Sequence, residues 1–383
     1  MDHNVLFAEI QQLESKYLPM WEEICLIESP TACKAGVDQV ADFCIAHAEK
    51  LGWQVVRGRE AISGDPVCIT MNPQGAKAPI CLSAHMDTVH PVGSFGSPAV
   101  RTEGGKIYGP GVMDCKGNIV AAMMVMEALQ NCGYTKRPVK LILQSDEETG
   151  SAGSEKRTVD FMARHAAGCL CFLNMEPHSA GKVTVQRKGI LKVRFDITGQ
   201  AGHAGMCYNF ASAIAEAAHK ILKVESWKNK EGITCNVGTI SGGTGVNVVP
   251  EKCSFAVDVR FTNEDERLQI LRELQTISDT AYVPGTQSSL HILSTRVAMP
   301  RTPQALALTE QMKRIFAQVG LPQLALNAAA GGSDCADMVC RGFTAVDSLG
   351  VEGGGLHSLA EWANLSSLIS CCQRVGALLW YLQ

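Results

Sequence analysis

A run of three carboxylates, Asp146-Glu147-Glu148, begins three residues after the apolar segment 139–143. That segment is rich in aliphatic and β-branched residues, which predicts a strand covered on both faces of a sheet. Three like charges at the end of a buried strand are costly unless a cation or a proton offsets them. A solvated acidic turn is the commoner reason for such a run, so a cation site depends on partners elsewhere in the chain.

Candidate partners stand in five short motifs. They are Ser83-Ala84-His85-Met86-Asp87, the glycine-rich turn Gly109-Pro110-Gly111-Val112-Met113-Asp114-Cys115-Lys116-Gly117, Leu173-Asn174-Met175-Glu176-Pro177, Gly202-His203-Ala204-Gly205 and Leu356-His357-Ser358-Leu359-Ala360-Glu361-Trp362. His85 and Glu176, like the acidic run, fall at predicted strand ends, where open α/β sheets bind ligands. Imidazole and carboxylate are the donors that suit zinc without thiolates. Singly, a histidine or a turn aspartate is usually structural, so the signal is the ordered set.

The elements that would hold these motifs alternate between strands and helices. This alternation predicts an α/β fold with a largely parallel sheet. The predicted strands are 54–56, 66–71, 78–84, 139–143, 170–175 and 343–347, and the predicted helices are 4–26 (with Pro19 able to kink or split it), 37–51, 117–130, 304–319 and 360–382.

The pattern changes between about 187 and 299. There the predicted order is β-α-β-β-α-β, which is typical of a ferredoxin-like layer. The strands are 190–197, 233–240, 252–261 and 289–293, and the helices are 210–224 and 264–281. We therefore expect a catalytic domain of residues 1–187 and 299–383, interrupted by an inserted domain of residues 188–298.

The composition excludes some classes of function. The chain has 383 residues and a formal net charge of -4, so it lacks the basic character of a nucleic-acid-binding protein. It has no run of 18 apolar residues, and its start lacks a basic region with an apolar core, so we expect neither a membrane span nor a signal peptide. The 16 cysteines include no Cys-x-x-Cys pair, which predicts reduced thiols in a cytoplasmic protein and argues against a thiolate zinc site.

The ordered set of motifs resembles the M20 family of zinc peptidases, which includes glutamate carboxypeptidases, acetylornithine deacetylase and succinyl-diaminopimelate desuccinylase. The residues that carry the resemblance are His85-x-Asp87, Asp114 with Lys116-Gly117, Glu147-Glu148, Glu176 and His357-Ser358. The resemblance covers nearly the whole chain. It implies a zinc-peptidase domain with a mostly parallel mixed sheet, an inserted ferredoxin-like lid or dimerisation domain, and two zinc ions per subunit, with Co²⁺ or Mn²⁺ as possible substitutes.

The resemblance also implies a role for each residue. Asp114 would bridge the two metals, His85 and Glu176 would complete one site, Glu148 and His357 would complete the other, Glu147 would be the general base, and Asp87 would hold the imidazole of His85. Physical reasoning agrees, because Asp87 projects to the same side of a strand as His85. The family typically has a cis peptide after the bridging aspartate, here Asp114-Cys115. Cys115 and Asn118 depart from the family pattern, although neither is a ligand by the resemblance.

The inserted domain carries further candidates by the same resemblance. His203 would polarise the scissile carbonyl, and in the family this residue commonly reaches the partner subunit's active site. The alternative is that His203 is a loop histidine with no catalytic role. Asn247, Arg260 and Gly332 match positions that touch substrate or line its pocket. A surface ion pair remains the alternative for Arg260. Lys188 and Arg301 lie near the expected hinges, where they could grip a substrate carboxylate.

These inferences favour a cytoplasmic hydrolase of an amide bond next to a free carboxylate, of glutamate carboxypeptidase type. An N-acyl amino acid deacylase would use the same site and is the alternative. The substrate would be a small peptide or an N-acyl amino acid, and the enzyme would be a homodimer. A catalytically silent binding protein would be expected to lack Glu147 or a ligand. A cysteine-nucleophile hydrolase would need a cysteine in a recognisable nucleophile setting, which the sequence lacks.

Overall fold

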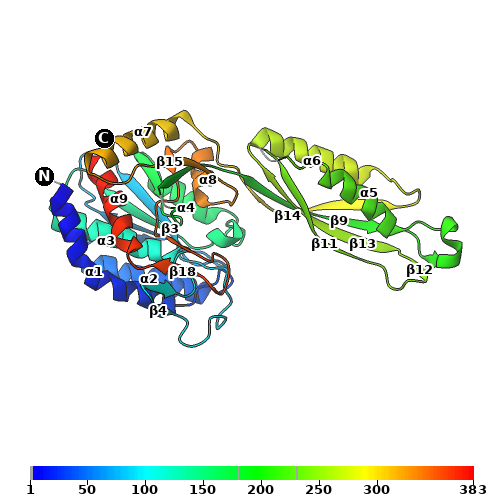
Figure 1. The fold of residues 1–383 in the computed structure, drawn as a ribbon, viewed down its shortest axis with the longest axis horizontal. Helices are drawn as coiled ribbons and strands as arrows, with labels where there is room; N and C mark the ends of the chain where they lie inside the picture. The colour runs from blue at the N-terminus through cyan, green and yellow to red at the C-terminus, as the bar shows by residue number, and fades with distance from the viewer. Residues whose placement is uncertain (1–2, 180, 230–231) are drawn as a thin grey trace. The chain divides into compact units, whose positions relative to one another are not determined.

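The computed structural model describes residues 3–179, 181–229 and 232–383 (Figure 1). The chain divides into two compact units. Unit 1 consists of Met1–Val185, Arg301–Asn327 and Ser333–Gln383, and unit 2 consists of Gln186–Pro300 and Ala328–Gly332. The short segment Ala328–Gly332 was expected in the catalytic domain, but it belongs to the unit formed by the inserted residues.

Unit 1 is built on a six-stranded mixed sheet with the order β1-β2-β6-β3-β7-β16. The strands are β1 (Gln54–Arg57), β2 (Val67–Met71), β6 (Val139–Gln144), β3 (Ile80–His85), β7 (Cys171–Asn174) and β16 (Ala345–Val346). β3 runs parallel to both neighbours, with Ile80 opposite Val139 of β6 and Cys171 of β7. The carboxyl ends of β6, β3 and β7 therefore meet at one edge of the sheet, and the predicted α/β class is confirmed.

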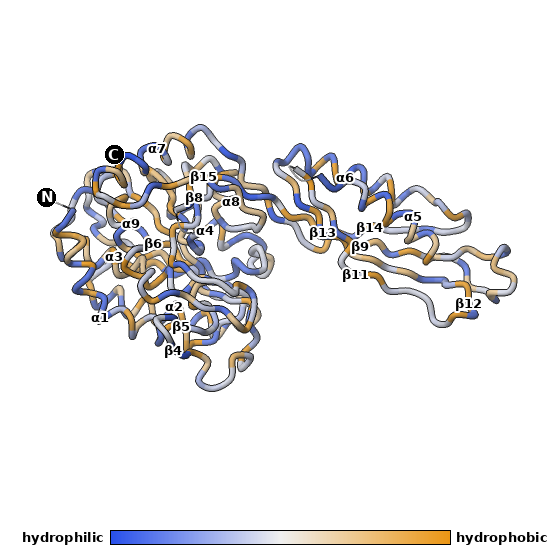
Figure 2. The backbone as a smooth tube through the Cα atoms, viewed as in Figure 1, coloured by the Kyte–Doolittle hydropathy of each residue, from blue (hydrophilic) through white to orange (hydrophobic). Residues whose placement is uncertain are grey.

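Helices cover both faces of this sheet. α1 (His3–Leu26), α3 (Lys116–Asn131) and α9 (Ser367–Tyr381) contact one another, and α3 contacts β3 and β6. α4 (Arg157–Ala166) and α8 (Asp334–Cys340) lie at the other face, against β6 and β7 respectively (Figure 1). α2 (Lys34–Lys50) contacts β1 and β2, and α7 (Pro303–Gln318) contacts α9 and β16. α3 is buried on nearly every side, and hydrophobic residues fill this interior (Figure 2).

Two features of unit 1 differ from the sequence-based expectation. The last helix was expected to begin at Ala360, but α9 begins at Ser367, because Trp362–Asn364 (β18) pairs with Lys106–Tyr108 (β5) instead. Unit 1 therefore has a second sheet, which has four strands in the order β17-β18-β5-β4. Its other strands are β17 (Gly353–Gly354) and β4 (Arg101–Glu103), and a separate two-stranded sheet pairs β8 (Lys182–Arg187) with β15 (Ala325–Ala329). α1 runs unbroken through Pro19, although the sequence allows a kink or a split there.

Unit 2 has the predicted order β-α-β-β-α-β. Its antiparallel sheet has the order β11-β13-β9-β14, formed by β9 (Gly189–Thr198), β11 (Thr234–Gly242), β13 (Lys252–Phe261) and β14 (Gln287–Arg296). The helices are α5 (Ala213–Glu225) and α6 (Glu264–Asp279), and a small extension comprises β10 (Gly202–His203), β12 (Val248–Val249) and the 3₁₀ turn η2 (Ala204–Asn209). Along β9, buried and less buried residues alternate, as expected for a sheet with one face on the core.

The cysteines follow the expectation from the sequence. Twelve of the 16 are buried, and all are free thiols, so they act as small core residues. Within the described ranges, no helix has both the length and the apolar character needed to cross a membrane.

Candidate active site

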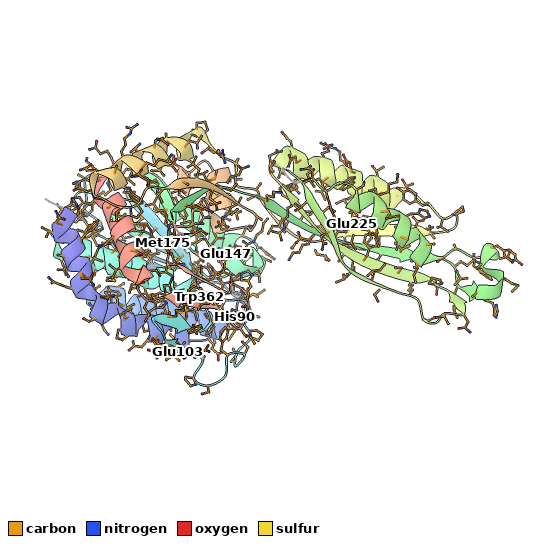
Figure 3. All side chains as sticks on the ribbon, viewed as in Figure 1. His90, Glu103, Glu147, Met175, Glu225 and Trp362 are labelled. Carbon is orange, nitrogen blue, oxygen red and sulfur yellow. The ribbon has the colours of Figure 1, made fainter. Side chains whose placement is uncertain are left out.

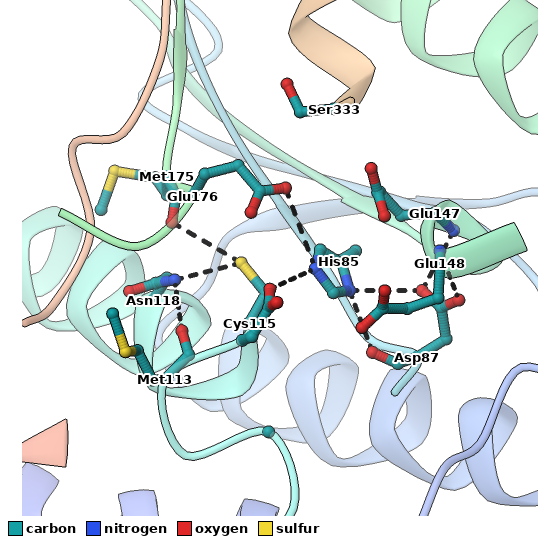
Figure 4. Close-up of polar contacts among 12 residues, drawn as sticks. His85, Asp87, Met113, Cys115, Asn118, Glu147, Glu148, Met175, Glu176 and Ser333 are labelled. Atoms are coloured by element: carbon teal, nitrogen blue, oxygen red, sulfur yellow. Dashed lines mark hydrogen bonds and ion pairs between the residues drawn. The ribbon is translucent and has the colours of Figure 1, made fainter. Parts of the chain in front are cut away.

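The site lies where the three parallel strands of unit 1 end. His85 is the last residue of β3. Glu147 and Glu148 lie in the short 3₁₀ turn η1 (Glu147–Thr149), which follows β6, and Glu176 comes two residues after β7. Figure 3 labels Glu147 and Met175 near these strand ends, and Figure 4 shows the surrounding side chains. The parallel register thus gathers side chains that are far apart in the sequence.

The imidazole of His85 is held between two aspartates. Its Nδ1 lies 2.9 Å from the backbone oxygen of Asp87 and 3.3 Å from that residue's Oδ1. Its Nε2 lies 3.0 Å from Oδ1 of Asp114 and 3.9 Å from Oε1 of Glu176. A histidine that gives one nitrogen to a carbonyl or carboxylate presents the other as a ligand, here toward Asp114 and Glu176.

Asp87 also holds the turn that carries the two glutamates. Its Oδ1 accepts the backbone N–H of Glu147, and its Oδ2 accepts that of Glu148, each at 3.1 Å. The hydroxyl of Thr31 donates to the same carboxylate at 2.6 Å. This fully buried side chain therefore connects the end of β3 to the turn that follows β6.

Asp114 lies between two histidines. While its Oδ1 faces His85, its Oδ2 lies 3.5 Å from Nε2 of His357. That same nitrogen lies 3.3 Å from Oε2 of Glu148. The side chain of His357 is 58% exposed, whereas Asp114 and Glu148 are largely buried, so His357 closes the cluster on its solvent side. The peptide Asp114-Cys115 is cis, as the resemblance implied.

The donor atoms form overlapping sets in which all atoms lie within 4.8 Å of one another. One set is His85, Glu147 and Glu176, and another is Asp114, Glu148 and His357. His85 and Asp114 form a third set with Cys115, which was not expected as a donor. Figure 4 shows the Glu147 and Glu176 carboxylates on the same side of the His85 ring. Two adjoining cation sites that share Asp114 would account for these sets.

The cluster is short of positive charge. Burial raises the pKa of Glu148 to about 7 and raises that of Glu176 well above its usual value. Burial would lower the pKa of His85, but its charge interaction with Cys115 and its hydrogen bonds to Asp114 and Asp87 raise that pKa well above the ordinary value. Hydrogen bonds to Asp114 and Glu148 raise the pKa of His357 to about 10. The cluster therefore favours added positive charge, which protons or bound cations would supply.

The donor set fits a pair of divalent cations. In the described part of the chain, the ion-pair partners of Asp114, Glu148 and Glu176 are histidines, not lysine or arginine. Buried carboxylates without such partners are usually protonated or bound to metal. Carboxylate and imidazole together suit zinc, cobalt and manganese better than they suit calcium, which takes oxygen ligands alone.

The remaining predicted residues lie in unit 2, in two groups. His203 and Asn247 are neighbours, because the backbone N–H of Ala204 donates to the backbone oxygen of Asn247 at 3.1 Å. The side chain of His203 is exposed, and its Nδ1 accepts the N–H of Gly205 at 3.0 Å.

Arg260 lies near the other end of the unit 2 sheet. Its Nε and Nη2 donate to Asp258 at 2.6 and 3.0 Å, and its Nη1 donates to the backbone oxygen of Ala330 at 3.1 Å. Gly332, two residues beyond Ala330, belongs to the same unit. The ion pair considered as the alternative for Arg260 is therefore present.

These two groups are separated along β13. The chain reaches His203 shortly after Thr198, and Thr198 lies opposite Lys252 at the start of β13. Arg260, in contrast, is near the end of β13. A strand of 10 residues spans about 30 Å. The chain enters unit 2 at Gln186 and leaves it at Pro300. The neighbouring backbone bridge between Arg187 and Met299 is at the Arg260 end of the sheet, so both of these passages of the chain lie at that end. His203 thus lies at the end of unit 2 remote from these passages.

Comparisons with known proteins agree with this geometry. The model of peptidase family M20/M25/M40 matches residues 81–380. The chain belongs to this family. Carboxypeptidase G2 of Pseudomonas sp. (strain RS-16) is 26% identical over 373 residues, which cover 95% of this chain and 89% of the relative. Acetylornithine deacetylase of Myxococcus xanthus is 32% identical over 217 residues, which cover 52% and 54% of the two chains.

A solved structure shares the fold. The dinuclear metal-binding M20 peptidase of Bacillus subtilis has a TM-score of 0.73 at 15% identity, covering 96% of this chain and 98% of its own. Family membership, together with the cluster of possible metal ligands in unit 1, makes this chain a metal-dependent peptidase or amidohydrolase.

Two residues of this M20/M25/M40 chain contribute to the site in ways that sequence reasoning missed. Cys115 was noted only as a departure from the family, yet its Sγ lies among the donors, 3.1 Å from Nδ2 of Asn118 and 3.5 Å from the Met175 oxygen. Glu361 stands four residues after His357, and its carboxylate contacts the loop of Asp114. Its place in the His357 motif was the available signal, but a single acidic residue in a loop does not reveal its partners.

Proposed function

We propose that this protein is a dinuclear zinc hydrolase that cleaves an amide bond next to a free carboxylate, in the manner of a glutamate carboxypeptidase. The observation that carries the proposal is the position of Asp114, whose two oxygens face His85 and His357 while the carboxylate of Glu147 lies beside the same cluster. This arrangement offers one shared ligand, two flanking sites and a further carboxylate for proton transfer.

In this proposal each ligand has a place. Asp114 would hold both ions, His85 and Glu176 would complete one site, and Glu148 and His357 would complete the other. Two bound zinc ions supply Lewis acidity and lower the pKa of water. Asp87 orients His85 through its contact with Nδ1, which keeps Nε2 available as a ligand.

Glu147 is the proposed general base. Its backbone is fixed by Asp87, and its buried side chain reaches the set of His85 and Glu176. From that position it would take a proton from the attacking water and pass it to the leaving nitrogen. A charge-balancing role beside the metals is the alternative, in which case its loss would reduce metal binding as well as activity.

The preference for a carboxypeptidase rests on the similarity to carboxypeptidase G2 along most of the chain. Arg260 would bind the substrate carboxylate, because its contacts with Asp258 and Ala330 engage three of its five N–H groups and leave two. N-acyl amino acid deacylation is the second candidate, and it is supported by the similarity to acetylornithine deacetylase over about half of each chain. Both reactions use the same ligands and the same base.

The functional unit in this proposal is a homodimer. β14 is an edge strand of unit 2, and its Ile292 and Leu293 are 55% and 50% exposed. An edge strand with apolar side chains pairs readily with another strand, and a second copy of the chain would form a two-fold symmetric pair. His203, at the end of unit 2 remote from the passages to unit 1, would then act in the partner subunit's site. The free thiols suit a reducing compartment such as the cytoplasm.

The test combines metal content and hydrolysis, measured on the wild type and on Glu147→Ala. The substrates are a panel of dipeptides with C-terminal glutamate and a panel of N-acyl amino acids. Two zinc ions in both proteins, with hydrolysis by the wild type alone, would support the proposal, and the panels would rank peptidase against deacylase. A wild type that binds no zinc would overturn the ligand assignment. A wild type that binds zinc but cleaves neither panel would overturn the substrate assignment.

A further inference from the structure

Glu361 is a buried carboxylate that none of the proposed catalytic steps uses. It is 1% exposed and lies directly before β18 in unit 1, four residues after His357. An acidic side chain is rarely buried to this extent unless its oxygens are hydrogen-bonded. The hydrogen-bond partners of Glu361 therefore indicate the role of this side chain.

The carboxylate accepts hydrogen bonds from three backbone N–H groups of the loop that carries Asp114. Oε1 accepts the backbone N–H of Met113 at 2.9 Å and that of Asp114 itself at 3.0 Å. Oε2 accepts the backbone N–H of Gly111 at 3.2 Å and lies 3.1 Å from Nε2 of His90. Hydrogen bonds to an ionised acceptor are stronger than those between neutral groups, so this loop is held firmly.

The backbone of Glu361 strengthens the same connection. Its oxygen accepts the N–H of Gly109 at 3.3 Å, and its N–H donates to the backbone oxygen of Ser358 at 3.2 Å. Ser358 follows His357 and in turn donates its N–H to the oxygen of Gly355 at 3.1 Å. Gly355 has a φ of +74°, and a Cβ there would come within 2.3 Å of the Ala360 oxygen, so the turn is tight. One residue thus ties the His357 turn to the Asp114 loop.

We propose that Glu361 is a positioning residue for the metal pair. It fixes the separation between Asp114 and His357, which face each other at 3.5 Å and would hold the same ion. The inference rests on the proposed function, since it concerns the ligands assigned there. Glu361 touches neither substrate nor metal, and it acts only through the two loops that it connects.

The test uses Glu361→Gln, which keeps the size of the side chain but replaces one oxygen with an N–H donor that faces backbone N–H groups. Zinc affinity is measured by competition with a chelator, and the ligand geometry is read from the visible absorption of the Co²⁺-substituted protein. We expect zinc affinity to fall roughly 10- to 100-fold, as is usual when a residue that supports a ligand is removed. The Co²⁺ spectrum should change in shape or intensity.

A buried carboxylate in unit 2 that also pairs with Lys220 at 3.0 Å provides the control. Glu216 is also fully buried and accepts two backbone N–H groups, those of Tyr282 at 2.9 Å and Val283 at 2.6 Å. Glu216→Gln should lower the melting temperature of the protein but leave zinc affinity and the Co²⁺ spectrum unchanged. If Glu361→Gln behaves in the same way as this control, Glu361 is merely structural and the inference is overturned.

A second measurement keeps the inference testable if Glu361→Gln does not fold. Hydrogen exchange of the segment 109–114 is followed by mass spectrometry in wild-type protein with and without zinc. Slow exchange in both states supports the inference, because Glu361 then orders the loop before metal arrives. Exchange that is slow only with zinc overturns it. If wild-type protein binds no zinc, both the proposed function and the inference fail. If wild-type protein binds zinc but Glu361→Gln has the same zinc affinity and Co²⁺ spectrum as Glu216→Gln, the inference fails and the proposed function stands.

Discussion

The carboxylate of Asp87 accepts the backbone N–H of Glu147 at 3.1 Å while its Oδ1 also lies 3.3 Å from Nδ1 of His85. One side chain therefore fixes a proposed ligand and the backbone of the proposed base. Burial would raise the pKa of Asp87, but its hydrogen bond and charge interaction with His85 lower that pKa. The aspartate is thus retained in its charged, accepting form.

Replacing Asp87 by asparagine should disturb both functions at once. The new N–H₂ group would face the donors of Glu147 or Glu148, because both N–H groups point at the Asp87 carboxylate. We expect kcat/KM to fall roughly 10- to 100-fold, as for other changes to residues that support a ligand. Steady-state kinetics with a zinc titration measure this effect. Wild-type kinetics in the variant would show that Asp87 has no part in orientation.

Glu176→Gln should separate metal binding from proton transfer. Glu176 lies 3.9 Å from Nε2 of His85, and we assign it to one ion only. The variant should retain about one zinc per chain in place of two, because an amide oxygen is a weaker ligand than a carboxylate. Atomic absorption on dialysed protein measures this content. Glu147→Gln is the control and should keep both ions while losing roughly 10²- to 10⁴-fold in kcat. Equal zinc loss in both variants would contradict the division of roles.

A pH-dependent contribution to stability is expected from Asp65, which lies away from the site. Burial would raise its pKa, but the N–H of Glu60 and the ammonium of Lys34 lower it to about 2, and its side chain is only 3% exposed. The guanidinium of Arg57 lies 2.9 Å from the same carboxylate. A folded pKa below the unfolded value of about 3.9 means that this stabilisation, about 2 kcal/mol, is complete above that value.

The stabilisation by Asp65 should be lost as pH falls from about 4 toward 2, where the carboxyl becomes protonated in the folded state too. Urea unfolding of the wild type and Asp65→Asn measures this loss. The difference in unfolding free energy between them should shrink by about 1 kcal/mol between pH 5 and pH 3. Other carboxylates titrate equally in both proteins and cancel in the difference. A difference that stays constant or grows toward pH 3 would contradict the assignment.

Thiol chemistry distinguishes the metal site from a cysteine nucleophile. Cys207 and Cys340 are exposed, whereas burial raises the pKa of residues such as Cys25 and Cys44 to about 12. A thiol reagent should therefore modify the two exposed residues first. Cys207→Ser and Cys340→Ser should each keep wild-type activity and zinc content. Inactivation by a thiol reagent with both zinc ions retained would instead favour a cysteine nucleophile.

The sequence predicted the elements whose pattern is local. β3, β6 and β7 are buried strands, so their positions could be inferred from short apolar runs, and with them the edge that gathers His85, Glu147 and Glu176. The failure at 360–366 has a different cause. Ala363 pairs with Ile107, which is distant in the sequence, and such a pairing leaves no local signal.

The same limit applies to the site. The order of motifs indicated which side chains to consider, but their contacts depend on loops that periodicity does not describe. Glu361 bonds to Gly111, Met113 and Asp114, and no spacing in the sequence reveals this. Cys115 likewise adopts its position among the donors only because the turn after Asp114 folds as it does.

Mixing two inactive variants tests whether His203 acts across a dimer. Glu147→Ala lacks the proposed base, and His203→Ala lacks the proposed oxyanion donor. If His203 serves the partner's site, a mixed dimer contains one intact site, formed by Glu147 of one chain and His203 of the other. After random reassociation, roughly a quarter of wild-type activity should return, since half of the dimers are mixed and each has one of its two sites intact.

The geometry of unit 2 is the reason to expect this complementation, because His203 and Arg260 lie toward opposite ends of a strand of 10 residues and the passages of the chain are at the Arg260 end. The control mixes Glu147→Ala with Glu176→Gln. Both substitutions lie in unit 1, so each site of a mixed dimer lacks a residue of its own chain and activity should not return. Light scattering establishes the oligomeric state of each sample. A monomer at micromolar concentration, or a dimer in which the first mixture stays inactive, would contradict action in the partner's site, and His203 would then serve its own chain or none.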